Sequence, residues 1–536
     1  RLFTLETRIA RHSSLGHNRL GRTHAGYVVA NGFCAGENVC GFGVPDILFR
    51  EFRPWGRPAF HAGWAQRVAA TLALLIAPAV SATEIADKSL LLPPNPEPFS
   101  QPVQSDPLLR MSQQVGPIAL FRSEVEAAVQ TNMLIQEARA GEREAEAARM
   151  QSRAALFPSL DLTVDANRSF ARNFSNDPGN IIERSRPEGR TDATASVRQR
   201  LLDFGATSSR INAGNARVSA ARAATFASGA DVALRLVTAW YSILAQRLME
   251  QAAIDYGMRQ ADLRSAVERR ITQGFSATGD LPRIDSAIAN VRTRLAMFRR
   301  DRASAEAQYR ALSGHDAPAN VYRVPLSLAD RLGQDVVEAM ALRAPVVQKA
   351  EAEARAARQD ARAARSERLP TIAAGVDAGR YGVFENSGDY DVRGRVIMRA
   401  QIGAGFNARA DQAIARADAA DAYALRVRQE ALRDAQMAWS DVKGLEAQLA
   451  AAEAAYLASR NNRDVYAARF ETSGGTLFDL VTSEDNYFYS IATYVQTLAE
   501  RDLSRFVLLA KAGALLDELH IQVDPATEHT DGRQMP

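Results

Sequence analysis

Apolar residues recur every three and four positions over long stretches of the chain, which predicts long helices that pack side by side. The spacing is clearest in two runs: Leu234, Val237, Tyr241, Leu244 and Leu248, and Ala435, Ala438, Val442, Leu445 and Leu449. This spacing is typical of helices that cross at a shallow angle. The many Ala on other faces favour a curved sheet of helices forming a tube, although a plain coiled coil has the same local pattern.

Two of the predicted helices are unusually long. The first is expected to run from Ile118 to Leu156 without a break, because it contains no Pro and Pro117 suits a helix start. Another, from about Ala206 to Arg270, would be roughly 90 Å long at 1.5 Å per residue. Average globular helices have about a dozen residues, so this is not an ordinary globular domain.

Two other regions, which begin after Pro158 and Pro370, contain strands in which apolar and polar residues alternate. The first strand carries Leu160, Leu162, Val164 and Ala166 against Asp161, Thr163, Asp165 and Asn167. The last carries Val396, Met398, Ala400 and Ile402 against Arg395, Ile397, Arg399 and Gln401, with Ile397 as an apolar exception. Such segments of about ten residues are typical of transmembrane β-barrels, although a soluble sheet with one wet face alternates similarly.

Only four strands are predicted, and four strands cannot close a barrel. Open strand edges are not viable in lipid, whereas three chains would supply twelve strands. The polar face would then line the lumen, with Asp161, Asp165, Arg395 and Arg399. Aromatic residues near the strand ends fit an interfacial girdle: Phe157, Phe170, Phe174, Phe204, Tyr381, Phe384, Tyr390 and Phe406.

Residues in the first half of the chain recur in the second half at nearly constant offsets, which indicates an internal duplication. Trp240 and Trp439 are 199 positions apart, and Arg270 and Arg469 have the same offset. Pro158 and Pro370 are 212 apart, whereas Phe204 and Phe406 are 202 apart. The first hairpin is therefore ten residues longer, which predicts the larger loop there.

These offsets define the predicted organisation. Each repeat has a helix, a β-hairpin, a long helix, a tip and a return helix. The first repeat is 110–318, with its hairpin at 157–205 and its tip at 270–285. The second is 335–520, with its hairpin at 369–406 and its tip at 469–485. Residues 83–109 form a polar Pro-rich segment, 319–334 a linker in an equatorial belt, and 521–536 a disordered tail.

The amino-terminal region differs in composition from the rest. Residues 67–82 have a basic flank, an apolar run and the small residues Val80, Ser81 and Ala82, as in a secretory signal peptide. Residues 1–66 are expected to be a leader or an over-long start, absent from the mature protein. The alternative is a small metal site at His24, Cys34 and Cys40.

Charge and reactive residues argue against several functions. The net charge of +3 favours neither nucleic-acid binding nor an acidic substrate. Beyond the leader there is no Cys, and the three His, His315, His520 and His529, lie far from any nucleophile–base or metal-ligand pattern. An enzyme is therefore not expected, and no cofactor is expected.

Several motifs, in their order and duplicated spacing, resemble the TolC family of outer-membrane channel proteins over roughly residues 110–520. They are the Pro-led strand starts, "RLLDFGA" (Arg200–Ala206), the Ala-Trp pairs, and the tips "GFSATGDLPRID" and "GGTLFDLVTSED". The resemblance implies an α+β membrane protein, a homotrimer with a 12-stranded transmembrane β-barrel, four strands per chain, continued by a long α-helical periplasmic tunnel. It also implies a passive conduit in the outer-membrane lipid, docked to a periplasmic adaptor protein and an inner-membrane ABC or RND transporter.

The resemblance also assigns roles at the tips, between Arg270 and Asp285 and between Arg469 and Asp485. Asp479 looks like the family's constriction aspartate, and Thr482 stands where a second acid is usual. Glu484 and Asp485 could supply that missing charge, or simply face solvent. Phe470 replaces the latch tyrosine and Gly475 a common arginine. Alternatively, Asp280 and Asp479 cap the returning helices.

Two kinds of cargo are compatible with this channel. The tip sequences and the lack of a lipid-anchoring Cys favour type I secretion of an unfolded protein, such as an RTX toxin or adhesin. The first alternative is efflux of drugs or other small molecules. The second alternative is a periplasmic structural coiled-coil protein, which would need no detergent for extraction.

Overall fold

The computed structural model describes residues 89–523, apart from residues 98, 101, 186, 386, 387, 402 and 473. These residues belong to one compact unit, Val80–Pro536. The predictions for the leader 1–66 and the signal peptide 67–82, together with the alternative metal site at His24, Cys34 and Cys40, lie outside the described residues.

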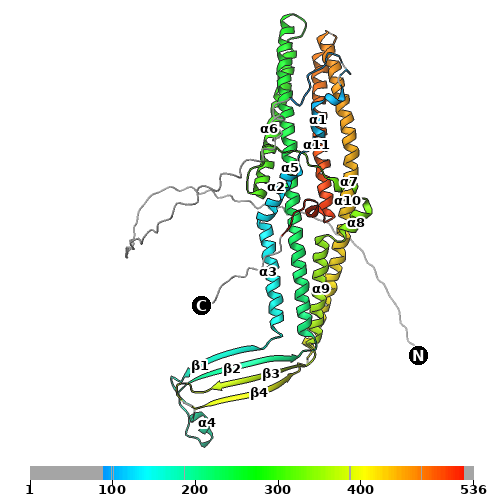
Figure 1. The fold of residues 1–536 in the computed structure, drawn as a ribbon. Coiled ribbons are helices and arrows are strands. Elements are labelled where there is room, and N and C mark those ends of the chain that lie inside the picture. Colours follow the sequence, from blue (N-terminus) through cyan, green and yellow to red (C-terminus); the bar gives the residue numbers. More distant parts are fainter. Residues whose placement is uncertain are drawn as a thin grey trace, which may run out of the picture. The chain divides into compact units, whose positions relative to one another are not determined.

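Helices make up most of the described chain, and four strands form one sheet (Figure 1). The first part contains η2 (Val103–Ser105), α1 (Pro107–Gln113), α2 (Ile118–Thr131), α3 (Met133–Ala154), β1 (Ser159–Arg168), η3 (Pro178–Asn180), α4 (Ile181–Arg184), β2 (Gly189–Leu202), α5 (Ala206–Thr272) and α6 (Asp280–Ser313). The second contains α7 (Ser327–Arg331), α8 (Gln334–Ala341), α9 (Pro345–Ser366), β3 (Thr371–Arg380), β4 (Tyr390–Arg399), α10 (Ala404–Glu471), α11 (Leu477–Lys511) and α12 (Leu515–Glu518).

The uninterrupted helix predicted from Ile118 to Leu156 is wrong, because the chain breaks at Asn132. Asn132 has extended backbone angles, and its side chain accepts a hydrogen bond from the Leu134 N–H, which caps α3. The same break separates α8 from α9, where Ala344 is extended and Pro345 begins the helix. Ala344 lies 212 positions after Asn132, the offset that relates the two hairpins.

The long helices α5 and α10 contain 67 and 68 residues, so each is about 100 Å long. Helix α5 packs against α3, α6, α9 and α11, and α10 packs against α9 and α11 (Figure 1). The predicted seam is confirmed on both helices: Val237 and Tyr241 are buried on α5, as are Ala435 and Val442 on α10. Shallow packing of neighbouring helices buries these positions.

The four strands form an antiparallel sheet in the order β1-β2-β3-β4. The loop between β1 and β2 contains η3 and α4 and is longer than the loop between β3 and β4, as the ten-residue difference predicts. The last strand ends at Arg399, so the predicted alternation extends too far at Ala400 and Gln401, and Ile402 lies outside the described residues. In the part of the chain that the structure describes, β1 and β4 are each paired along one edge only.

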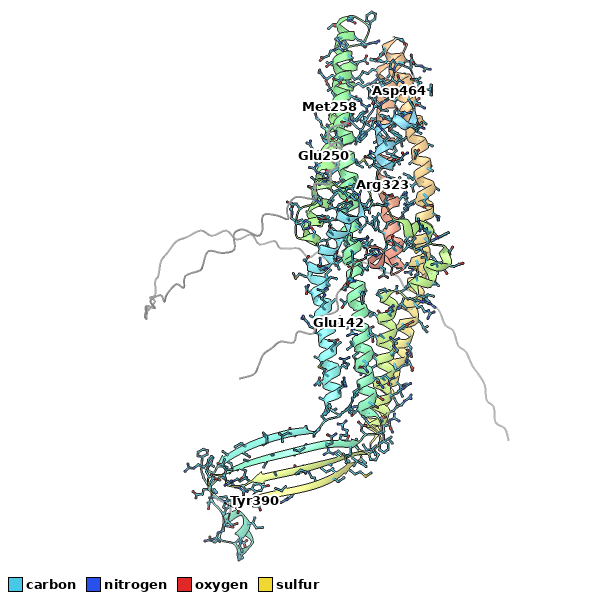
Figure 2. All side chains as sticks on the ribbon, viewed as in Figure 1. Glu142, Glu250, Met258, Arg323, Tyr390 and Asp464 are labelled. Atoms are coloured by element: carbon cyan, nitrogen blue, oxygen red, sulfur yellow. The ribbon has the colours of Figure 1, made fainter. Side chains whose placement is uncertain are left out.

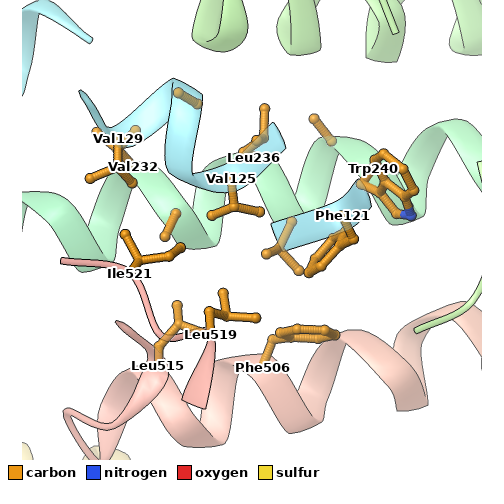
Figure 3. Packing of buried hydrophobic residues seen from close by; sticks show 14 of the residues in the cluster. Phe121, Val125, Val129, Val232, Leu236, Trp240, Phe506, Leu515, Leu519 and Ile521 are labelled. Atoms are coloured by element: carbon orange, nitrogen blue, oxygen red, sulfur yellow. The ribbon is translucent and has the colours of Figure 1, made fainter. Parts of the chain in front are cut away.

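The largest apolar cluster joins α2, α5, α11, the linker and the end of the described chain (Figure 3). Trp240 is fully buried there, with its ring nearly perpendicular to that of Phe121 and its Nε1–H donating to the Tyr322 carbonyl at 2.9 Å. Ile521 and Val523 are also buried in this cluster. The prediction of a disordered tail over 521–536 is therefore wrong for its first residues, and 524–536 lie outside the described residues.

The two tryptophans that are 199 positions apart provide a matched test of this core. Trp240→Ala removes a fully buried side chain and should cost about 3–5 kcal/mol of unfolding free energy. Trp439 is only partly buried, so Trp439→Ala should cost less than half as much. Thermal unfolding of the detergent-solubilised protein, followed by circular dichroism, measures both. Equal losses would contradict this assignment of the core.

Candidate functional site: a two-faced sheet and two helix tips

The strand register sorts the sheet into one polar and one apolar face. Directly opposed residues of antiparallel strands point to the same side, and Asp161 opposes Ser196, which opposes Asp377, which opposes Arg393. All four predicted lumen residues share this polar side: Asp161, Asp165, Arg395 and Arg399. The other side carries Leu160, Leu162, Val164, Val197, Val376, Val392, Val396 and Met398, all exposed in the single chain.

Several charges on the polar face form ion pairs, either between strands or within one strand. Arg395 Nε lies 2.8 Å from Asp377 Oδ2, and Ser196 donates to the same carboxylate at 2.7 Å. Asp161 lies 4.0 Å from Arg198. Asp165 directly opposes another acid, Asp192, which in turn is bound to Arg190 at 2.6 Å. This face is therefore hydrated and of mixed charge, as an aqueous pore wall requires.

Most of the predicted girdle residues are exposed near the strand ends. Phe157 and Phe204 lie at the helix end of the sheet, and Tyr390 lies at the loop end (Figure 2). Phe170, Phe174 and Phe384 are also exposed, and Tyr381 is half-buried under Arg190. The side chain of Phe406 lies outside the described residues.

At the other end of the long helices, the two tips pack against each other. Val267 of α5, Phe470 of α10 and Leu480 of α11 form the core of this contact. Arg270 Nη1 donates to the Phe470 carbonyl at 2.7 Å, and its guanidinium lies 4.4 Å from the centre of the Phe470 ring. A cation over an aromatic ring stabilises this contact, so Arg270 and Phe470 join the first tip to the second without a tyrosine hydroxyl.

The second tip turns at Gly475, which has no room for a side chain. A Cβ atom there would lie 2.9 Å from the Phe470 nitrogen and 3.0 Å from the Arg469 carbonyl carbon. The family's common arginine could not be accommodated without moving this backbone. Arg469 itself lies over Tyr466 of its own helix, with 5.8 Å between guanidinium and ring centre.

Asp479 lies in the first turn of α11. Thr476 is the N-cap residue: its Oγ1 accepts from the Asp479 N–H at 3.2 Å and donates to Asp479 Oδ2 at 2.7 Å. The residues have the spacing of a capping box, but Asp479 accepts from the Thr476 hydroxyl, so Asp479 orients the hydroxyl that caps the helix. Asp280 begins α6, but the N-cap residue is Gly279 and no side chain caps that helix. The alternative that Asp280 caps its helix is therefore wrong.

The remaining tip residues separate into exposed and internal positions. Thr482 is exposed. Glu484 is only 4% exposed and lies 3.6 Å from Arg259, so the alternative that it faces solvent is wrong. Asp485 lies 3.2 Å from Arg294 and accepts a hydrogen bond from Tyr256. Burial, followed by the charges of the two acids, raises the pKa of Tyr256, which keeps this donor protonated.

A polar network beneath the tips was not predicted from the sequence. Described residues between 89 and 113 contact α5 and α10, and Arg463, fully buried, donates to the Leu92 carbonyl at 2.8 Å. Asp106 is also fully buried and accepts bonds from Arg460 and from the Tyr456 hydroxyl, both at 2.8 Å. Burial is the main cause that raises the pKa of Tyr456.

This network fixes the amino-terminal segment to both repeats. The Leu90 N–H donates to Asp255 of α5 at 2.7 Å, whereas Asp464 of α10 accepts from the Asn95 N–H at 3.3 Å. Breaking a buried ion pair leaves an uncompensated charge and is strongly destabilising. The one signal available in the sequence was the Asp106-Pro107 pair, which is a helix-start pattern.

Neither a metal site nor a membrane-crossing helix is found in the part of the chain that the structure describes. No three His, Cys, Asp or Glu side chains in those residues are grouped so that they could hold a metal ion. Among the described helices, none is both long enough and apolar enough to cross a membrane.

Comparison with known proteins agrees with this architecture. Residues 125–315 match the family model described as outer membrane efflux protein. A membrane protein from Pseudomonas aeruginosa has the same fold, with a TM-score of 0.68 and 19% identity, covering 75% of this chain and 92% of that one. A search of curated proteins finds no significant match.

Two outer-membrane proteins have similar TM-scores. The CmeC outer membrane channel of Campylobacter jejuni has a TM-score of 0.66 at 12% identity, covering 73% of this chain and 85% of that one. The outer membrane protein VceC of Vibrio cholerae has a TM-score of 0.65 at 16% identity, covering 74% and 96%. The fold is thus that of the outer-membrane channels. The predicted resemblance to the TolC family is confirmed, by this fold and by the family match.

The close approach at Gly475 gives a test of the tip. Gly475→Ala places a methyl group against the Phe470 and Arg469 backbone, which should cost about 1–3 kcal/mol locally. Amide hydrogen exchange over residues 470–480 should then accelerate at least fivefold. Gly474→Ala is the matched control, since its Cβ would meet nothing closer than 4.0 Å, and it should leave exchange unchanged. Equal acceleration in both variants would show that the tip does not pack in this way.

Proposed function

We propose that this chain is one of three identical protomers of an outer-membrane exit duct. Three four-stranded sheets would join into a 12-stranded barrel, and the helices of three chains would form a periplasmic tunnel. The observation that carries the proposal is the sheet itself, which has two unpaired edges, one apolar face and one charged face. Lipid requires that strand edges be closed, and an aqueous channel requires a polar wall.

The duct would work as the outer component of a tripartite export system. Its partners would be a periplasmic adaptor protein and an inner-membrane ABC or RND transporter, which supplies the energy, while the chain itself is a passive conduit. The match to a family described by efflux supports transport as the role. A periplasmic structural coiled coil would not need one apolar sheet face, and it would be extracted without detergent.

Two cargoes remain as proposals within this role. The tip sequences favour an unfolded polypeptide of a type I secretion system, whereas the family description favours small-molecule efflux. A deletion strain distinguishes them. Loss of one secreted protein with unchanged drug sensitivity supports secretion. Drug sensitisation with an unchanged secreted protein profile supports efflux.

Asp479 is proposed to form a ring of three carboxylates at the tunnel constriction. Because Asp479 also takes part in the helix cap, two variants are needed to distinguish the effect of its charge from the effect of its hydrogen bond with Thr476. Carboxylates around a narrow lumen attract cations. Asp479→Asn removes the charge but leaves an oxygen that can accept from Thr476, so it should reduce the cation over anion permeability ratio severalfold in planar bilayers. Thr476→Ala removes the N-cap but keeps the charge, so selectivity should persist.

The opposite result would assign Asp479 to the helix cap. If Asp479→Asn leaves the reversal potential unchanged, the constriction ring is wrong. If wild-type protein forms no channels in the bilayer, the proposed function itself fails.

A further inference from the structure

The apolar face of the sheet carries charge at one end only. Among the residues of the four described strands, Arg168 and Arg380 are the only charged ones on that face, since Arg168 follows the alternation of Leu160 to Ala166 and Arg380 opposes Ala193, which opposes Val164. Each is the last residue of its strand before a hairpin loop. Both side chains are exposed.

The two arginines occupy related positions. They are 212 positions apart, the offset of the two hairpins. Arg168 opposes Gly189 and Arg380 opposes Ala193, so they are staggered by four residues along β2. The stagger displaces Arg380 from Arg168 by about 13 Å along the strand direction. Across the sheet the two residues are about 10 Å apart, because β2 lies between their strands. Barrel strands tilt by such a stagger, so the two arginines can lie at one level around a closed barrel.

A shallow apolar groove leads to this basic end. It has a volume of about 440 Å³, and its lining includes Leu162, Val164, Ala195 and Val392, with Arg380 and Tyr390 at the loop end. Tyr390 directly opposes Arg380 across the strand pair and is 79% exposed. An aromatic ring with a polar tip beside a long cationic side chain is typical of a membrane–water interface.

Glu385, a described acid on the loop between β3 and β4, is bound to Thr191. Its carboxylate accepts from the Thr191 N–H at 3.2 Å and from the Thr191 hydroxyl at 3.1 Å. Neither Arg168 nor Arg380 has an ion pair with a described residue. Their positive charges are therefore available to a ligand that approaches from the apolar side.

We propose that Arg168 and Arg380 bind the phosphate groups of an anionic phosphorylated lipid, whose acyl chain lies along the groove between β1 and β4. This inference rests on the proposed barrel, in which the loop end of the sheet lies in the outer leaflet. Arginine pairs with phosphate through two parallel hydrogen bonds, and the apolar groove suits a hydrocarbon chain. In a trimer, two arginines per chain form a basic belt of six that fixes the height of the barrel in the membrane.

Native mass spectrometry of the intact detergent-solubilised protein tests this proposal, with diphosphorylated lipid A as the probe and its dephosphorylated form for comparison. Wild-type protein should bind the phosphorylated lipid at least tenfold more tightly. The double variant Arg168→Gln/Arg380→Gln should lose that preference, and Arg380→Lys, which keeps the charge but cannot form two parallel hydrogen bonds, should lose only part of it. Arg399→Gln is the matched control, because Arg399 is an exposed arginine on the polar face.

The results separate this inference from the proposed function. The inference is overturned if the double variant binds phosphorylated lipid as tightly as wild-type protein, or if Arg399→Gln loses as much affinity. Bilayer conductance of the same preparations then distinguishes the two failures. If channels form normally while lipid binding is unaffected, only the lipid site is wrong. If wild-type protein forms no channels, the proposed function and the lipid site fail together.

Discussion

Two unpaired strand edges determine what the rest of this structure can be. Among the described residues of one chain, β1 and β4 each leave one row of backbone donors and acceptors without a strand partner. Unsatisfied backbone groups cost several kcal/mol each in hydrocarbon, while the apolar face is unsuited to water. In the proposed barrel, partner chains would satisfy both demands by joining the sheets edge to edge, with Asp161 and Arg395 facing inward and Leu162 and Val396 outward. The helices that continue from these strands would then be arranged around the same axis.

The repeated register predicts how neighbouring chains would pair. Leu160 opposes Val197 in the first hairpin, and Ile372 opposes Met398 in the second. Leu160 and Ile372 are 212 positions apart, the offset that relates the two hairpins. Their cross-strand partners, Val197 and Met398, therefore occupy equivalent positions in the two hairpins. Val197 opposes Val376 where the two hairpins meet, so Met398 should oppose Val164 of the next copy. Both side chains of this predicted pair belong to the apolar face, as a continuous barrel requires.

Periodicity predicted the long helices and the strand faces, because helix and strand bury residues at different intervals. It missed the break at Asn132, because a polar cap inside a helical pattern leaves the apolar spacing intact. Pro345 marks the equivalent break in the second repeat, so comparing the two repeats could have revealed the break at Asn132. It also missed the buried Asp106–Arg460 pair and the internal position of Glu484, because isolated charges reveal partners only once helices are assembled. Ile521 and Val523 pack in the core, where a polar tail was predicted.

Disulfide cross-linking across the predicted β1–β4 junction tests the central claim most directly. Within one chain these strands are the opposite edges of the sheet, about 14 Å apart at three strand spacings, which is too far for a disulfide. Val164→Cys/Met398→Cys should therefore form covalent trimers under oxidation in membranes. The control Leu160→Cys/Met398→Cys, displaced by four residues or about 13 Å, should not. Monomers only, or equal cross-linking by both pairs, would contradict a barrel shared among three copies.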